Sequence, residues 1–363
     1  MSDCCCSANS CSSAAAITPY NKADKWVIGE ICTPKGNIPI VSTQLLFHDT
    51  LGAWKVRWGI GRMNYKINSG LYAVGNPDHG SPVLVSANYK LTFDVLRKEL
   101  SDLDCWLLIL DTKGINVWCA AGKGTFGTDE LVNCISKTCL SEIVAHRTLI
   151  LPQLGAPGVS AHEVKKQTGF SVVYGPVRAQ DIKTFISSAH TATREMRTVQ
   201  FTLPDRLVLT PMELVPAVRK SLPVLGVLFI TNHFAARPFD KHDVTAYAGA
   251  VIAGSVATPG LLPYIPGKAF AWKGWLIGLG WTAKYLFFAK RFKKGNRLLS
   301  AGELLLLPAI SSYLAMNFTG SSTYTSPSGV NREMKRALPW IIGSAAVGGA
   351  LTLGAHLFDR RKQ

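Results

Sequence analysis

The sequence is poor in charged residues, and acidic residues are the scarcer kind. Charged side chains make up 17% of its 363 residues, and 39 Lys and Arg stand against 23 Asp and Glu. This low share of charge, together with a positive mean hydropathy of +0.16, is unusual for a protein that lies wholly in water. The shortage of charge is greatest after residue 210, whereas residues 20–210 have the composition of a water-soluble domain.

Motifs of nucleic-acid-binding proteins are also missing. The net charge of +16 is accompanied by no zinc-finger spacing, Arg-rich recognition helix or RNA-binding aromatic motif. Several basic residues instead form short clusters beside apolar segments, where cations meet anionic lipid headgroups. These residues are Lys290, Arg291, Lys293, Lys294, Arg297, Arg332, Lys335, Arg336, Arg360, Arg361 and Lys362. We therefore expect a lipid bilayer, and no nucleic acid, as a partner.

Neither a disulfide framework nor a signal peptide is recognisable. The nine cysteines are odd in number and irregularly spaced, unlike those of small secreted domains. The first residues lack the basic start and long apolar run of a signal peptide, so the domain at 20–210 is expected in the cytoplasm. Residues 1–19 predict a disordered tail rich in Cys, Ser and Ala. Its cysteines offer an alternative, capture of a soft metal ion; they are Cys4, Cys5, Cys6 and Cys11.

Short apolar runs alternate with helical patterns between residues 83 and 189. Strands are expected at 83–86, 106–110, 148–151 and 171–174, and helices at 92–100, 129–144, 160–167 and 182–189. This alternation predicts an α/β domain with a Rossmann-like parallel sheet. Ligands of such sheets bind beyond the carboxyl ends of the strands, which here precede Gly- and Pro-rich loops after Leu110, Leu151 and Tyr174.

The C-terminal part, 211–363, is expected to be an all-α transmembrane domain. Its five apolar segments, 214–234, 244–266, 270–289, 299–318 and 337–357, each approach the about 20 residues that cross a bilayer. Five crossings would place the basic residues 290–297 outside, against the positive-inside tendency. Four crossings with a re-entrant segment at 244–266 would place them inside, so the side of the C-terminus stays open.

The most distinctive motif follows the expected strand at 106–110 and reads NVWCAAGKGT, residues 116–125. Its GKGT end is similar to a phosphate-binding P-loop. A P-loop, however, needs Gly where Val117 stands and Ser or Thr where Gly124 stands. The motif therefore lacks the opening glycine and the magnesium-binding hydroxyl, and we reject this interpretation.

The other interpretation of this motif starts from Cys119. The residue stands at the beginning of an expected short helix, beside the small residues Ala120, Ala121 and Gly122. Backbone dipoles at a helix N-terminus stabilise the negative charge of a thiolate, and small neighbours let a large flat ligand come close. From the residues alone, a buried inert cysteine remains the competing interpretation.

Residues 116–123 resemble the signature of the mercury-methylating corrinoid proteins. The resemblance covers about residues 54–210 and includes RMNYK at 62–66, SANYK at 86–90, DTKG at 111–114, LPQLGAPG at 151–158 and YGPVR at 174–178. The apolar C-terminal part is similar to that family's membrane domain. Residues 20–210 also resemble the large subunit of the corrinoid iron–sulfur protein of acetyl-CoA synthesis. That subunit carries a four-cysteine cluster domain and no membrane domain, so the mercury-methylating family is the better match.

The resemblance implies a cobalamin-dependent methyltransferase that moves a methyl group from cysteine-ligated methylcobalamin to mercury(II), giving methylmercury. It implies that Cys119 is the catalytic residue and the lower axial ligand of cobalt. Residues expected to bind the cofactor are Asn116, Val117, Trp118, Cys119, Ala120, Ala121, Gly122, Lys123, Gly155 and Ala156. Trp118 would pack beside the corrin ring, while Lys123 either meets an edge of the cofactor or is merely solvated.

The partners implied by the resemblance are a small ferredoxin with two 4Fe–4S clusters as electron donor and a methylated folate or its carrier protein as methyl donor. The expected location is the cytoplasmic (inner) membrane, crossed several times, with the corrinoid domain in the cytoplasm. The alternative function is a membrane-bound corrinoid methyl carrier of one-carbon metabolism with another acceptor. From a different class, a membrane transporter or sensor with a soluble ligand-binding domain is a further hypothesis.

Overall fold

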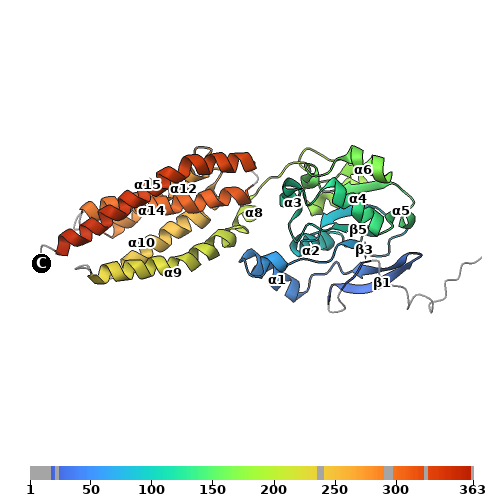
Figure 1. Cartoon of the computed structure of the whole chain (residues 1–363), viewed down its shortest axis with the longest axis horizontal. Coiled ribbons are helices and arrows are strands. Elements are labelled where there is room, and N and C mark those ends of the chain that lie inside the picture. The colour runs from blue at the N-terminus through green and yellow to red at the C-terminus, as the bar shows by residue number, and fades with distance from the viewer. Residues whose placement is uncertain (1–17, 21–23, 235–240, 290–296, 323–325, 361–363) are drawn as a thin grey trace, which may run out of the picture. The chain divides into compact units, whose positions relative to one another are not determined.

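The computed structural model consists of two compact units, one made of Met1–Val56 with Ile60–Gln200 and the other of Arg57–Gly59 with Phe201–Gln363 (Figure 1). The structure describes residues 18–20, 24–234, 241–289, 297–322 and 326–360. Cys4, Cys5, Cys6 and Cys11 of the expected tail, and most of the basic cluster at 290–297, lie outside these residues. The domain limits predicted from the sequence, 20–210 and 211–363, stay a prediction.

The first unit is built on a sheet whose described strands have the order β1-β2-β3-β5-β4-β6-β7. The strands are β1 (Val27–Thr33), β2 (Gly36–Val41), β3 (Gly70–Val74), β4 (Val83–Ala87), β5 (Cys105–Leu110), β6 (Thr148–Leu151) and β7 (Ser171–Tyr174). β4 pairs in parallel with both β5 and β6, and β6 pairs in parallel with β7. These four strands are the ones predicted from the sequence.

The prediction of a parallel sheet holds only in part, because the sheet is mixed. β2 pairs with β3 in parallel, but two other pairings are antiparallel. β3 runs antiparallel to β5, with Gly70 opposite Ile109. β1 and β2 form an antiparallel hairpin in which Thr33 pairs with Gly36. Only Pro34 and Lys35 separate these strands, and a connection this short cannot make the crossover that parallel strands require.

Helices cover both faces of this sheet. The face with Trp106, Leu108 and Leu110 packs against α3 (Val117–Lys123), α4 (Thr128–Lys137), α5 (Leu140–Ile143) and α6 (Ala161–Thr168). The face with Leu107 and Ile109 packs against α2 (Lys90–Glu99) and α7 (Ile182–Ser187). Successive β5 residues thus enter opposite cores, which explains the strand's unbroken apolar sequence. The single helix expected at 129–144 is two helices, because Cys139 has φ 50° and breaks it.

A buried ionic network joins α1 (Phe47–Arg57) to α2. The Asp49 carboxylate accepts hydrogen bonds from Lys90 Nζ and Arg97 Nη2, both at 2.8 Å. Asp94 accepts from the same two side chains, at 2.8 Å from Lys90 Nζ and 2.9 Å from Arg97 Nε. Arg97 Nη1 also donates to the carbonyl of Ser42 at 2.6 Å. Because Arg97 is fully buried, its charge requires these partners.

All five apolar segments of the second unit form helices. They are α9 (Thr210–Phe234), α10 (Lys241–Ile252) continued by a π-helical turn (Ala253–Ala257) and α11 (Thr258–Leu261), α12 (Phe270–Phe288), α14 (Arg297–Asn317) and α15 (Pro327–Arg360), preceded by the short α8 (Leu203–Leu207). In the described residues, three stretches are long and apolar enough to cross a membrane: Lys241–Leu261, Arg297–Gly320 and Ser328–Ala355.

These helices pack through small residues and through hydrogen bonds between helices. A Cβ on Gly278 of α12 would lie 2.6 Å from Ser311 of α14, and one on Gly302 of α14 would lie 2.8 Å from the carbonyl oxygen of Gly348 on α15. Ser311 Oγ donates to the carbonyl of Ala250 at 2.8 Å. Close backbone approach at glycine and serine hydrogen bonds between helices are typical of helix packing in lipid.

Candidate cofactor-binding site

The loops after β4, β5, β6 and β7 lie at one edge of the sheet, because these four strands point the same way. The loop after β5 leads directly into α3, which carries the motif singled out in the sequence. The loop after β6 contains a short 3-10 turn, Gln153–Gly155, and this turn packs against α3. This arrangement is where ligands of α/β sheets bind.

The helix α3 begins with an Asn cap. Asn116 has extended backbone angles, φ −64° and ψ 158°, and its side-chain oxygen accepts a hydrogen bond from the backbone N–H of Cys119 at 3.0 Å. This bond satisfies one of the N–H groups that a helix start leaves free. The helix ends at Gly124, whose φ of 80° suits glycine. Gly124, the second glycine of GKGT, therefore ends a helix. In a P-loop a helix would begin here, so the structure agrees with the rejection of that interpretation.

The two sides of α3 differ in burial. Val117, Ala120 and Ala121 are 7%, 0% and 6% exposed and belong to the core beneath the helix. Cys119 is half-buried with a free thiol, and Gly122, three residues further on, is exposed. A Cβ built on Gly122 would meet no atom within 4 Å. The outer side of the helix therefore presents one thiol beside open space.

The structure separates the predicted site residues accordingly. Trp118 and Asn116 are half-buried, and Lys123 is exposed in the last turn of the helix. Ala120 and Ala121, which were expected to leave room for a ring, face the core instead. Ala121 also meets the loop after β6 at Gly158, where a Cβ would lie 3.0 Å from Ala121 Cα and 2.1 Å from the carbonyl oxygen of Phe126.

Gly155 and Ala156 follow β6 and lie close to the same helix. Gly155 is buried, and a Cβ there would stand 2.6 Å from the Phe126 ring. Ala156 is half-buried. Gln153 is held by Arg197, whose Nη1 donates to its side-chain oxygen at 2.7 Å. The glycines of this loop therefore allow the loop to touch α3, and any contact with a cofactor stays a prediction.

Asn88 positions the loop before α3, a role that the sequence interpretation missed. Its side-chain oxygen accepts hydrogen bonds from the backbone N–H groups of Thr112 at 3.1 Å and of Gly114 at 3.0 Å. Its amide nitrogen donates to Asp111 Oδ1 at 2.9 Å. The residue is 3% exposed, so its amide bonds to the chain rather than to water. The SANYK stretch drew attention to this position, but nothing in it indicated the partner loop.

The other metal-binding and thiol side chains do not form a competing site in the described part of the chain. No group of three or more His, Cys, Asp or Glu residues there is placed to hold a metal ion. Burial raises the pKa values of the Cys105 and Cys134 thiols to about 12. His79 Nδ1 is hydrogen-bonded to the carbonyl oxygen of Ile143 at 2.7 Å, and His146 Nε2 to that of Ser81 at 2.9 Å. Cys119 is thus the thiol in reach of a ligand at this edge.

Residues 61–186 match the family model described as CO dehydrogenase/acetyl-CoA synthase delta subunit. This stretch contains β4 to β7, the Asn88 loop and α3. The match agrees with the part of the resemblance that concerned acetyl-CoA synthesis. The match does not extend to the helical second unit.

Relatives with the same region are gamma subunits of acetyl-CoA decarbonylase/synthase complexes. The protein of Methanopyrus kandleri is 33% identical over 123 residues, which are 33% of this chain and 26% of the relative. That of Methanocaldococcus jannaschii is 32% identical over 122 residues, 33% of this chain and 25% of the relative. The gamma 2 subunit of Methanosarcina thermophila is 36% identical over 115 residues, 31% and 24% of the two chains. The chain thus spans about a quarter of the length of these relatives.

Proposed function

We propose that the chain is a membrane-bound corrinoid protein that receives a methyl group and passes it on, with Cys119 as the axial ligand beneath cobalt. The observation that carries this proposal is the half-buried, free thiol of Cys119 on the outer side of α3. This thiol lies at the ligand-binding edge of the sheet and within the stretch that matches a subunit family of acetyl-CoA synthesis.

The residues at this edge fit a cobalt corrinoid. A corrin ring supplies the four in-plane ligands of its metal, so the protein needs to add a single donor rather than a cluster. The described residues offer such a lone donor and no three-ligand group. A Cβ on Gly122 would meet no atom within 4 Å, so the surface beside the thiol is open to a bound group. When bound, the cobalt would supply a site that accepts a methyl group and releases it.

The chain's own residues would hold the thiol in place. Asn116 fixes the first turn of α3 through the backbone N–H of Cys119. Asn88 fixes the loop before that turn through Thr112 and Gly114. Gly158 allows the loop after β6 to support the helix from below. Such support from residues behind a metal ligand restricts its position and tunes its donor strength.

The acceptor that we propose is mercury(II). A thiolate is a strong donor, and a cobalt corrinoid held by Cys119 would supply a methyl group that is readily given to a soft electrophile such as mercury(II). The resemblance at residues 116–123 supports the same acceptor. Electrons would come from a small ferredoxin with two 4Fe–4S clusters, and the methyl group from a methylated folate or its carrier protein.

A second candidate has a different acceptor in one-carbon metabolism, and the relatives favour it. Each relative described above is a subunit of a complex named for acetyl-CoA decarbonylase/synthase activity. This candidate shares the cofactor and the role of Cys119 with the first. The two differ only in what takes the methyl group, so an acceptor assay separates them.

The proposed location is the cytoplasmic membrane, with the corrinoid-binding unit in the cytoplasm. The stretch Ser328–Ala355 supports it most strongly, because its most apolar part is almost entirely exposed on the surface of the protein. An apolar helix surface of this extent is costly in water and stable in hydrocarbon. The contacts of Gly278 and Gly302 described above also suit lipid.

The test uses membranes that contain the full chain. They are supplied with reduced ferredoxin, a methyl donor and mercury(II), and methylmercury is measured. Formation of methylmercury that depends on the chain and is lost in Cys119→Ala supports the mercury proposal. Loss of methyl from the loaded protein to an acceptor of acetyl-CoA synthesis, with no methylmercury, supports the second candidate. Full activity of Cys119→Ala would contradict both.

A further inference from the structure

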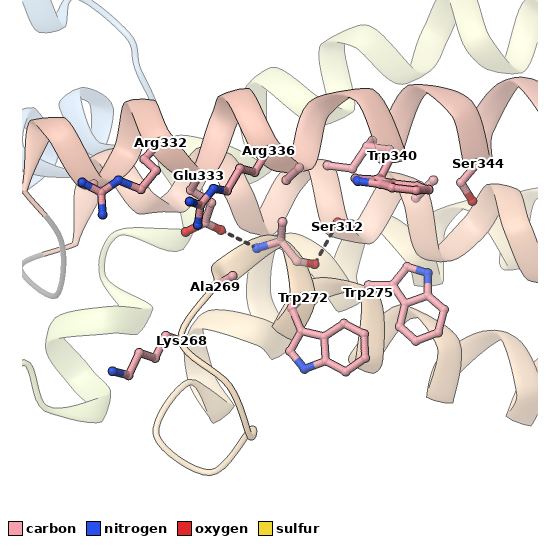
Figure 2. A pocket seen from close by; sticks show the side chains of 15 residues that line it. Lys268, Ala269, Trp272, Trp275, Ser312, Arg332, Glu333, Arg336, Trp340 and Ser344 are labelled. Carbon is pink, nitrogen blue, oxygen red and sulfur yellow. Dashed lines mark hydrogen bonds between the residues drawn. The ribbon is translucent and has the colours of Figure 1, made fainter.

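The second unit contains a groove between α12, α14 and α15 that no step of the proposed methyl transfer uses. The groove has a volume of about 850 Å³, which is the size of sites for small organic ligands. Tryptophans dominate its apolar lining, namely Trp272 and Trp275 from α12 and Trp340 from α15. We call this the tryptophan groove, and Figure 2 shows it.

One end of the tryptophan groove is cationic. Lys268, Arg332 and Arg336 line it there (Figure 2), and all three are exposed. No hydrogen bond or ion pair joins these three side chains to another residue in the described part of the chain. The lining contains one carboxylate, Glu333. Its Oε1 accepts a hydrogen bond from the backbone N–H of Ala271 at 2.7 Å, so it is engaged at the start of α12.

The basic and apolar side chains follow one side of α15 in order. Arg332, Arg336, Trp340 and Ser344 stand four residues apart and all line the groove, so they form a row along the helix. Two arginines at this spacing repel each other, and an anion between them would remove the repulsion. Within two turns the row changes from the charged Arg332 and Arg336 to the apolar Trp340. The helix beyond Trp340 remains apolar toward Ala355.

The aromatic side chains of the groove are of the kind that gathers at a membrane surface. The Trp272 and Trp275 rings are stacked, with centroids 5.4 Å apart and an angle of 12° between planes. Trp340 is 82% exposed although it lies within an apolar helix. Tryptophan gathers where headgroups meet hydrocarbon, and basic side chains beside it reach the headgroup phosphates.

We propose that the tryptophan groove binds one anionic phospholipid. Its phosphate group would contact Arg332, Arg336 and Lys268, and an acyl chain would lie against Trp275, Trp340 and Ile341. Basic pockets between membrane helices bind acidic headgroups in this manner. A free phosphate ion shares the headgroup chemistry but would leave the tryptophan surface uncovered. The inference rests on the proposed membrane location and not on the methyl acceptor.

The test measures lipid retention by the full chain in detergent, using native mass spectrometry after addition of phosphatidylglycerol or phosphatidylcholine. Phosphatidylglycerol should be retained preferentially. Arg336→Gln should weaken its retention about fivefold, the effect of one basic residue at an anionic membrane surface. The matched control is Lys335→Gln, which removes the same charge from the adjacent position outside the groove lining and should change retention little. Trp340→Ala should weaken phospholipid retention without changing the binding of inorganic phosphate.

Three results would overturn the proposal. Equal retention of the two lipids would show that the groove does not recognise the headgroup charge. Equal effects of Arg336→Gln and Lys335→Gln would show only a general attraction of the basic protein surface to anionic lipid. Displacement of the lipid by millimolar inorganic phosphate, with no effect of Trp340→Ala, would assign the site to the free ion. Carbonate extraction of native membranes tests the location separately. A chain that stays in the membrane but lacks lipid selectivity contradicts the groove proposal alone, whereas a chain released by carbonate contradicts both.

Discussion

The side-chain oxygen of Asn116 lies 3.0 Å from the backbone nitrogen of Cys119 and accepts its hydrogen bond. The residue before the helix and the proposed cobalt ligand are therefore joined directly. The bond fixes the backbone from which the thiol projects, while the side chain of Cys119 stays free to bind a ligand. Substitution at Asn116 should consequently act on the ligand-binding position without removing the thiol.

Asn116→Ala should reduce cobalamin affinity and stability together. Loss of the cap costs about 1 kcal/mol, and the first turn of α3 should fray at Cys119. Asn116→Ser should keep most of the wild-type cobalamin affinity and stability, because serine also caps helices. Cobalamin titration and thermal unfolding of the three proteins check this. An Asn116→Ala protein that binds cobalamin as tightly as the wild type would contradict a positioning role.

Gly122 and Gly158 should respond in opposite ways to alanine. Gly158→Ala should lower the free energy of unfolding by several kcal/mol and disturb α3, because its Cβ would lie 2.1 Å from the Phe126 carbonyl oxygen. Gly122→Ala should fold normally and gain up to about 1 kcal/mol, since alanine favours helix and space is open there. Its cobalamin affinity should nevertheless fall, because the methyl group occupies the ring's approach. Unchanged affinity in Gly122→Ala would place the ring elsewhere.

Asn88→Ala should destabilise the loop before α3. Removal of its side chain leaves the buried N–H of Thr112 without this acceptor and loosens Gly114, at a cost of about 2 to 3 kcal/mol. Asn133→Ala is the matched control, because the Asn133 side chain is exposed and its hydrogen bond to Glu130 is long, at 3.3 Å. Chemical denaturation of both variants measures the difference. Similar small losses in the two would show that Asn88 does not support the loop.

Acid should weaken the first unit through Asp49. Burial would raise the pKa of its carboxyl, but hydrogen bonds from Lys90 and Leu46 and the charges of Lys90 and Arg97 hold the pKa below its ordinary value of 3.8. A carboxyl with a lowered folded pKa stabilises fully above its unfolded value and loses this contribution as pH falls through the folded value. Stability should therefore be constant above about pH 5 and decline below about pH 4.

Asp49→Asn should remove part of this acid dependence. At neutral pH it should lower the free energy of unfolding by about 3 kcal/mol, because the buried Arg97 loses one of its two carboxylate partners. Asp102→Asn is the control, since Asp102 is exposed and lies 3.9 Å from Lys183. Unfolding curves of the full chain between pH 3 and pH 7 measure both effects. An unchanged pH profile in Asp49→Asn would show that other carboxyls cause the decline.

Cysteine alkylation at neutral pH should distinguish the thiols. Cys105 and Cys134 are buried, and their raised pKa values of about 12 keep them protonated, so they should not react. Cys119 and Cys139 are half-buried and free and should react. Loading with cobalamin should protect Cys119 and leave Cys139 as it was, as peptide mass spectrometry would show. Equal labelling of Cys119 with and without cobalamin would argue against its role as ligand.

The four parallel strands and the start of the helix that carries Cys119 could be predicted because their signals are local. β5 is an unbroken apolar run, and Asn116 stands directly before its helix. β3 (Gly70–Val74) was missed because its short apolar run has no alternation, although Asn68-Ser69 before it and Gly75-Asn76-Pro77 after it are turn residues that could have marked its ends. The β1–β2 hairpin had a usable signal, the Pro34-Lys35-Gly36 turn between two β-rich runs.

The parts that could not be predicted depend on contacts between distant residues. Asn88 and Gly114 are 26 positions apart, and only the parallel pairing of β4 with β5 brings them together. The burial of Ala120 and Ala121 follows from the side of α3 that faces the sheet, which the motif alone does not specify. The tryptophan groove likewise brings Trp272 near Arg332 because α12 and α15 both pack against α14.

The central claim is that the sulfur of Cys119 binds cobalt, and X-ray absorption at the cobalt edge tests it most directly. The full chain loaded with cobalamin should show a sulfur atom in the first coordination shell. Cys119→Ala should lose this sulfur and retain only nitrogen and oxygen neighbours. A first shell without sulfur in the wild-type protein, or an unchanged sulfur signal in Cys119→Ala, would contradict the account.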